Sequence, residues 1–227
     1  MVLDHTSQAR NSQIFFKVVD LGKYSYGKQE ELMPFQVVKQ KVIDAVLNWR
    51  DEAFFWLLYY TGVRKSEAYE RVADDFKISE SRLIVDFHQR KKRGAEVPPL
   101  ELPLHWYGID KIAKSVWLAA KSRPTEKAVY IYENKKRVRI IKEEKWIFPN
   151  IQSTKAWELV QEVLGEEYYP HFLRLNRLTE IAQDPTASLT RLKSFSGIKS
   201  TTALDSYLGT AKKEQQKAIE FMNKKYR

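Results

Sequence analysis

Cysteine is absent from this 227-residue sequence, and its absence removes several classes of function at once. Without thiols the chain can form neither disulfides nor thiolate zinc sites, and it has no cysteine nucleophile. Long apolar runs are also missing: none approaches the ~20 residues that cross a bilayer, and no secretory signal is visible. We therefore expect a soluble, cytoplasmic protein with no membrane partner.

The sequence also has fewer acidic than basic residues. Asp and Glu number 29 against 39 Lys and Arg, so the formal net charge is +10 at pH 7. Such a balance indicates a polyanionic partner, with nucleic acid as the first candidate and a membrane surface as the second. A hydrophobic content of 43% and an aromatic content of 13% are typical of a globular protein.

Hydrophobic periodicity predicts an α+β fold, mostly helical, with a small antiparallel sheet. Residues 1–30 are expected to be a linker or residual N-terminal arm, and residues 31–227 a single domain. The expected helices lie after Pro34 (with Phe35, Val38, Val42, Val46 and Trp49 on one face), at 53–60 (capped by Asp51), 66–72, 108–121, 155–164, 170–182, 189–195 and 212–226. In the helix at 108–121 the expected buried stripe is Ile109, Ile112, Ala113, Val116 and Trp117.

The expected strands are 82–89 and 97–103, joined by a basic tip at 90–94, followed by a β-rich segment at 128–148 with a turn at 133–136. Prolines at 98, 99 and 103 favour an edge position for the returning strand.

The segment around Gly62 organises the candidate site. An apolar helix leads into Gly62, which suits the left-handed position just past a helix end. Arg64 follows two residues later, before a second helix. A turn held between two packed helices is a rigid mount for an anion-binding guanidinium group.

Further chemistry-bearing residues lie elsewhere in the chain. His171 and Arg174 stand three apart at the start of a helix, and therefore on one face. Lys91 or Lys92 is expected at the hairpin tip, and Tyr207 lies twenty residues before the last residue. No carboxylate set for a metal accompanies them. These side-chain types suit phosphoryl transfer on a phosphodiester without metal or cofactor.

Each of these side-chain types has a physical role in the cleavage of a phosphodiester. Two guanidinium groups can hold the equatorial oxygens of a phosphodiester transition state bidentately. A tyrosine hydroxyl is a weak nucleophile at its usual pKa of about 10, so it requires nearby cations or a base. A lysine can protonate the departing 5′ oxygen.

Residues 61–67 (TGVRKSE) resemble the TGxRxSE box of the tyrosine recombinases, the integrase family, and residues 171–174 resemble their HxxR box. The resemblance covers most of residues 31–227, and the tail from Tyr207 to Gln215 is most similar to integrases of archaeal viruses and plasmids. It implies a site-specific recombinase that cleaves and rejoins DNA through a 3′-phosphotyrosine. It also implies a homotetramer on paired DNA sites, a monomer or dimer without DNA, and a location in the host cytoplasm.

The resemblance assigns roles to individual residues. Arg64 and Arg174 would clamp the scissile phosphate, Lys91 would be the general acid, His171 the acid/base helper and Tyr207 the nucleophile. Strand alternation leaves Lys91 and Lys92 open as alternatives for the general acid. The expected DNA contacts are Lys65, Arg90, Lys92, Arg93 and Arg177.

Two departures from the family pattern motivate alternatives. The N-terminal DNA-binding domain that the family usually has is expected to be missing or reduced to residues 1–30. Ile198 stands nine residues before Tyr207, where the family usually has His or Trp, and the adjacent Lys199 is a candidate substitute. A recombinase-fold DNA-binding protein with impaired catalysis is therefore a second hypothesis, and a type IB topoisomerase-like nicking and resealing enzyme is a third.

Overall fold

The computed structural model describes residues 33–86, 99–133, 136–184 and 188–196. Within these ranges the helices are α1 (Phe35–Asp44), α2 (Trp49–Thr61), α3 (Lys65–Tyr69), α4 (Ile109–Lys121), α5 (Ser153–Leu164), α6 (Pro170–Gln183) and α7 (Leu189–Ser196), with a 3₁₀ turn at Ala73–Asp75. The strands are β1 (Phe76–Ile78), β2 (Arg82–Val85), β3 (Leu100–Pro103), β4 (Thr125–Glu133) and β5 (Lys136–Glu144). The predicted α+β class, helix-rich with antiparallel strands, is confirmed.

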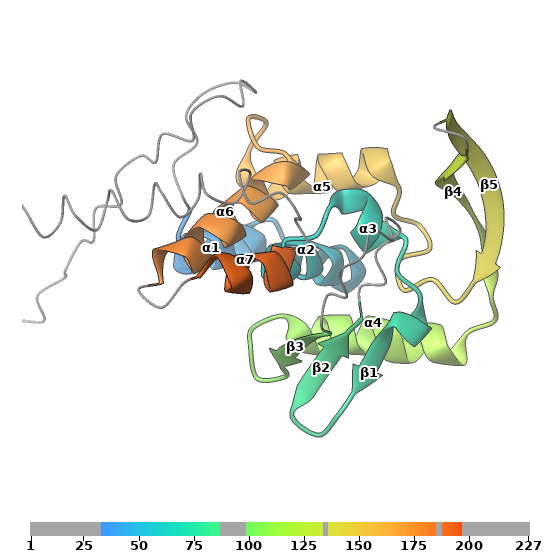
Figure 1. Ribbon diagram of the computed structural model, residues 1–227, viewed down its shortest axis with the longest axis horizontal. Helices are drawn as coiled ribbons and strands as arrows, with labels where there is room; N and C mark the ends of the chain where they lie inside the picture. The colour runs from blue at the N-terminus through green and yellow to red at the C-terminus, as the bar shows by residue number, and fades with distance from the viewer. Residues whose placement is uncertain (1–32, 87–98, 134–135, 185–187, 197–227) are drawn as a thin grey trace, which may run out of the picture.

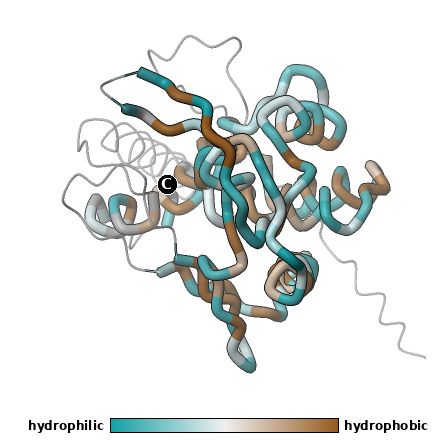
Figure 2. The backbone as a smooth tube through the Cα atoms, turned by 90° about the vertical axis from the view of Figure 1, so that its right-hand side faces the viewer, coloured by the Kyte–Doolittle hydropathy of each residue, from teal (hydrophilic) through white to brown (hydrophobic). Residues whose placement is uncertain are grey.

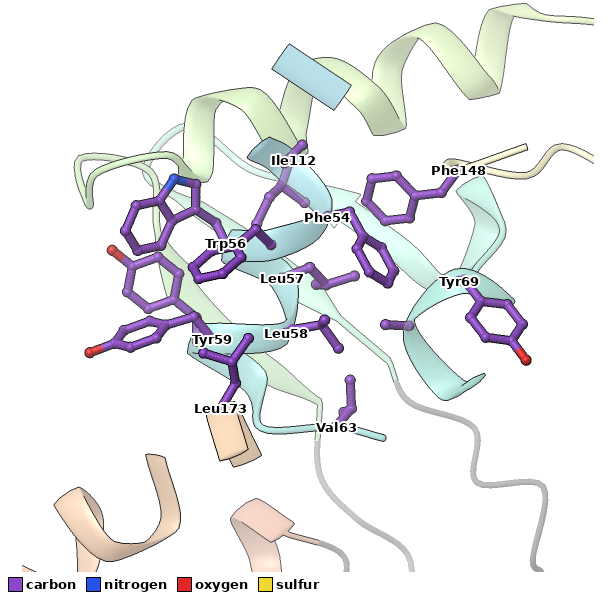
Figure 3. Packing of buried hydrophobic residues seen from close by; sticks show 14 of the residues in the cluster. Phe54, Trp56, Leu57, Leu58, Tyr59, Val63, Tyr69, Ile112, Phe148 and Leu173 are labelled. Atoms are coloured by element: carbon purple, nitrogen blue, oxygen red, sulfur yellow. The ribbon is translucent and has the colours of Figure 1, made fainter. Parts of the chain in front are cut away.

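Helix α2 is the centre of the molecule, with α4 below it, α5 above it and α6 to one side in Figure 1. Every residue from Ala53 to Thr61 is buried, as expected for a helix that is apolar on all sides. Figure 3 shows Phe54, Trp56 and Leu57 on successive faces of α2, packed among side chains from α4 and from the segment before α5. Each such side chain contributes about 1.5–3 kcal/mol by leaving water.

The beginning of α2 differs from the prediction. Asn48, not Asp51, caps the helix: its Oδ1 accepts hydrogen bonds from the backbone N–H groups of Arg50 and Asp51, each at 3.1 Å. The helix accordingly begins at Trp49, earlier than predicted. An Asn side chain is as effective a cap as Asp, so sequence preference could not separate the two residues.

For two apolar residues, Val46 and Trp117, the prediction of a covered position is wrong. Helix α1 ends at Asp44, and Val46 is 85% exposed with a φ of 49°. Trp117 on α4 is 51% exposed, and Lys121 Nζ lies 3.9 Å from the centroid of its ring. The helical periodicity correctly predicted that Val38, Val42 and Ile112 are buried. It does not predict where a helix ends or how much of its surface other elements cover.

In the part of the chain that the structure describes, antiparallel strands form two separate sheets, whereas one was predicted. In the first the order is β1-β2-β3, so β3 is an edge strand, as its prolines predicted. Strand β1 was not predicted, and α3 ends at Tyr69, three residues earlier than expected, because Val72 forms a β-bridge with Trp146.

Among the strands of the described ranges, β4 and β5 pair only with each other, from Thr125↔Glu144 to Glu133↔Lys136. They form the ribbon at the right of Figure 1, which stands at the front of the molecule in Figure 2. No helix in the described ranges is both long and apolar enough to span a membrane.

Candidate functional site

Arg64 occupies a turn that is fixed on both sides. Helix α2 ends where Gly62 adopts the left-handed conformation (φ 57°) and its N–H donates to the carbonyl of Leu58 at 2.9 Å. Val63 then points into the core beneath α2, as Figure 3 shows. Arg64 follows as the residue before α3, with 58% of its side chain exposed. The predicted rigid mount is therefore present, with the guanidinium group at the surface.

Glu67 stabilises this arrangement from within α3. Its Oε2 accepts a hydrogen bond from the backbone N–H of Arg64 at 3.0 Å, and its Oε1 lies 3.1 Å from Arg64 Nη1. The first contact closes the helix start in the manner of a capping box, and the second orients the guanidinium group. Because the pair is largely exposed, it adds little to overall stability.

Arg174 reaches the same turn from the opposite part of the sequence. Its side chain is buried on α6, and its Nη1 donates a hydrogen bond to the carbonyl of Gly62. The second predicted motif is thereby joined to the first, although the two residues are 112 positions apart. Arg174 adds a positive charge directly behind the Arg64 turn.

His171 lies one helical turn before Arg174, just after Tyr169 and Pro170 open α6. Its side chain remains exposed. The surrounding protein, and then the charges of Arg174 and Arg64, lower the pKa of the imidazole below its usual value of 6.5. The imidazole is therefore neutral at pH 7 and able to accept a proton.

Two aromatic residues near His171 were not singled out in the sequence. Tyr169 stacks on the imidazole, and Trp157 of α5 stacks on Tyr169. The sequence could have pointed to Tyr169, because it stands immediately before Pro170 and His171. Nothing in the sequence pointed to Trp157.

The two predicted DNA contacts within the described ranges have different surroundings. Lys65 is half-buried, its Nζ lies 5.1 Å from the centroid of the Trp157 ring, and burial lowers its pKa. Arg177 is mostly covered: its side chain is 17% exposed and pairs with Glu180 at 2.7 Å. Arg177 also lies 5.7 Å from the centroid of Phe195 on α7.

The remaining predicted residues lie outside the described ranges: Arg90, Lys91, Lys92 and Arg93 between β2 and β3, and Lys199 and Tyr207 after α7. Within the described ranges no group of three His, Asp or Glu residues is arranged to hold a metal ion. What the described part offers is two arginines and a neutral histidine around one turn, an arrangement suited to binding an anionic group and accepting a proton beside it.

Neither a protein-family model nor a curated protein matches this sequence. Solved structures do match. XerH site-specific recombinase bound to its difH substrate, in a pre-cleavage complex, is 16% identical with a TM-score of 0.54; the match covers 77% of this chain and 49% of that one. XerH bound to palindromic difH in a post-cleavage complex is 16% identical with a TM-score of 0.57, covering 84% and 53%.

XerA recombinase is 14% identical with a TM-score of 0.56, covering 86% of this chain and 65% of that one. The chain therefore matches less than two thirds of the length of each of these proteins. At such low identity the likeness concerns the fold alone: this chain shares the fold of the matched parts of XerH site-specific recombinase and XerA recombinase.

Proposed function

We propose that this protein is a tyrosine recombinase that cuts and rejoins double-stranded DNA through a covalent tyrosine intermediate, with residues 31–227 as its catalytic domain. The observation that carries the proposal is the contact of Arg174 with the carbonyl of Gly62, which joins the two motifs around the Arg64 turn. The fold shared with XerH and XerA, and the net charge of +10, support the same reading.

In the proposed reaction Arg64 and Arg174 bind the scissile phosphate. The hydroxyl oxygen of Tyr207 attacks phosphorus as its proton passes to His171, and the bond from phosphorus to the 5′ oxygen breaks. Lys91 protonates that oxygen, which leaves as a 5′ hydroxyl. The phosphotyrosine conserves the energy of the broken bond, so a 5′ hydroxyl of a second strand can displace the tyrosine with no nucleotide cofactor.

Lys92 is the alternative general acid, since it is adjacent to Lys91 in the sequence between β2 and β3. Lys199 is proposed to interact with the phosphate in place of the family's usual His or Trp, and Lys65, Arg90, Arg93 and Arg177 to contact DNA nearby. In this proposal the protein assembles as a tetramer on paired DNA sites, and it derives from an archaeal virus or plasmid.

The test uses duplex DNA that the protein demonstrably binds, nicked close to candidate cleavage positions so that the released fragment diffuses away and the covalent product accumulates. Wild type and Tyr207→Phe are incubated with end-labelled substrate in the presence of a chelator and analysed on a denaturing gel. We expect a protein–DNA adduct with wild type alone. Equal adduct with both proteins would exclude Tyr207 as the nucleophile.

A second candidate function is DNA binding without turnover, and Ile198 is the observation that favours it. Tight binding with no adduct on any nicked substrate would support this candidate. Relaxation of supercoiled plasmids without sequence requirement, lost in Tyr207→Phe, would instead support a topoisomerase-like activity.

A further inference from the structure

A row of stacked side chains connects the Arg64 turn to His171. Lys65 Nζ lies 5.1 Å from the centroid of the Trp157 ring, and the Trp157 and Tyr169 rings stack at 5.8 Å with an interplanar angle of 16°. The Tyr169 ring and the His171 imidazole are 6.4 Å apart and nearly parallel, at 3°. Lys65 of α3, Trp157 of α5, and Tyr169 and His171 at the start of α6 together form an aromatic row.

We propose that Tyr169 and Trp157 are positioning residues that hold the imidazole of His171 in a fixed orientation toward the Arg64 turn. The catalytic meaning of this inference rests on the proposed function, in which His171 takes the proton of the nucleophile. The structural part, that two aromatic rings set the plane of an exposed imidazole, stands on the geometry of the row.

An exposed histidine on a helix is not oriented by its own backbone. The second side-chain torsion of histidine has a broad, roughly two-fold preference, so the ring plane rotates unless a neighbour restricts it. A neighbouring parallel ring provides such a restriction, because aromatic pairs prefer offset-stacked arrangements at centroid separations of this order. The 3° angle between Tyr169 and His171 is what this restriction predicts.

The aromatic row is not required to attach α6 to the protein. Helix α6 already inserts Phe172 and Leu173 into the core. Asn176, also on α6, forms hydrogen bonds with the backbone of Met33. Trp157, in contrast, is 41% exposed, so it is not part of the core that holds α6 in place. Trp157 contacts the Tyr169 ring and the Lys65 ammonium group, and the second contact is a cation–π arrangement that ties the row to α3.

The row gives His171 a second connection to the Arg64 turn. Arg174 makes the first connection through the carbonyl of Gly62. The row makes the second through Lys65, the residue next to Arg64. Two attachments at different points fix both the distance of the imidazole from the Arg64 turn and the orientation of its ring. One attachment fixes only the distance. Proton transfer depends on that direction.

The imidazole itself is the reporter for the test. The charged groups that act on it are Arg174 on α6 and Arg64 on the turn, and both, after burial, lower its pKa. The Tyr169 ring lies beside the imidazole, with the two ring centroids 6.4 Å apart, and so contributes to that burial. Removing the ring is expected to raise the pKa of His171 toward its usual value.

The experiment is an NMR titration of the histidine ring protons in the full chain without DNA, with His171→Gln to assign the signal. We expect a cross-peak between the rings of Tyr169 and His171 in wild type. Tyr169→Leu and Trp157→Leu are expected to raise the His171 pKa, whereas Tyr169→Phe, which keeps the ring, should leave it unchanged. In the cleavage assay, Tyr169→Leu should form adduct about 10- to 100-fold more slowly, and Tyr169→Phe at the wild-type rate.

Absence of the ring cross-peak in wild type would overturn the inference, even if Tyr169→Leu does not fold. An unchanged His171 pKa in a folded Trp157→Leu or Tyr169→Leu protein would overturn it as well. The titration requires no DNA, so its outcome is separate from that of the proposed function. A wild-type protein that forms no adduct but shows the expected pKa changes would refute the recombinase reaction and retain the orienting role of the row.

Discussion

Lys127 and Tyr69 are joined by a hydrogen bond from the lysine Nζ to the carbonyl at the end of α3, at 2.6 Å. The same Nζ donates to the carbonyl of Phe148, also at 2.6 Å. The side chain is 3% exposed, and burial lowers its pKa to about 7. The ribbon of β4 and β5 is therefore anchored to α3, the short helix that Arg64 directly precedes.

Lys127 should make stability depend on pH. Its pKa is about 7 in the folded protein and near 10.4 in the unfolded chain, so between these values the unfolded state binds more protons. The free energy of unfolding should consequently rise with pH in this window, by up to about 1.4 kcal/mol per pH unit, and should be insensitive to this group below pH 7.

Urea unfolding of wild type and Lys127→Met at several values from pH 7 to 9.5 measures this contribution as the difference between the two proteins. The range stops there because burial also raises the pKa values of Tyr59 and Tyr60, to about 12 for Tyr60, and these groups affect stability above pH 10. Lys77→Met, at an exposed lysine of β1, is the control and should show no such trend. A difference that stays flat across the range would contradict the assignment.

Two glycines with positive φ should respond differently to alanine. At Gly62 (φ 57°) a new Cβ would have ordinary contacts, the nearest being Phe195 Cε1 at 3.6 Å, so Gly62→Ala should cost about 1 kcal/mol of backbone strain. At Gly108 (φ 79°) the Cβ would lie 2.2 Å from Trp56 Cδ1, so strain and overpacking add to about 2–4 kcal/mol. Chemical denaturation of both variants tests the order, and equal losses would show that Trp56 can move aside.

Asn176 should be important for stability because it satisfies both backbone groups of Met33. Its Oδ1 accepts from the Met33 N–H at 2.8 Å and its Nδ2 donates to the Met33 carbonyl at 3.0 Å, both in a buried setting. Asn176→Ala leaves these groups unpaired and should lower the free energy of unfolding by about 1–3 kcal/mol. Gln40→Ala removes an exposed hydrogen bond to Asp44 and serves as the control, with little change expected. Similar losses in the two variants would mean that water replaces Asn176.

Arg64 should contribute to DNA binding through charge. If its exposed guanidinium group contacts a phosphate, Arg64→Ala should weaken binding and reduce the slope of log K against log salt by about one. Arg82→Ala, which removes an exposed arginine of β2 paired with Glu101, is the matched control for net charge. Binding isotherms at several salt concentrations distinguish the two, and identical slopes for both variants would place Arg64 away from the DNA backbone.

The local parts of this protein are determined by its sequence. The left-handed Gly62, the position of Arg64 before α3, the placement of His171 and Arg174 one turn apart and the edge position of β3 all follow from short-range rules of helix ends, periodicity and proline geometry. Such rules act over a few residues, and the sequence displays those residues directly.

Tertiary structure alone decided the contacts between distant segments. The bond of Arg174 to Gly62, the burial of Lys127 under α3 and the stacking of Trp157 on Tyr169 depend on how helices pack, which no local pattern encodes. The exposure of Val46 and Trp117 has the same origin: an apolar residue is buried only if another element arrives to cover it.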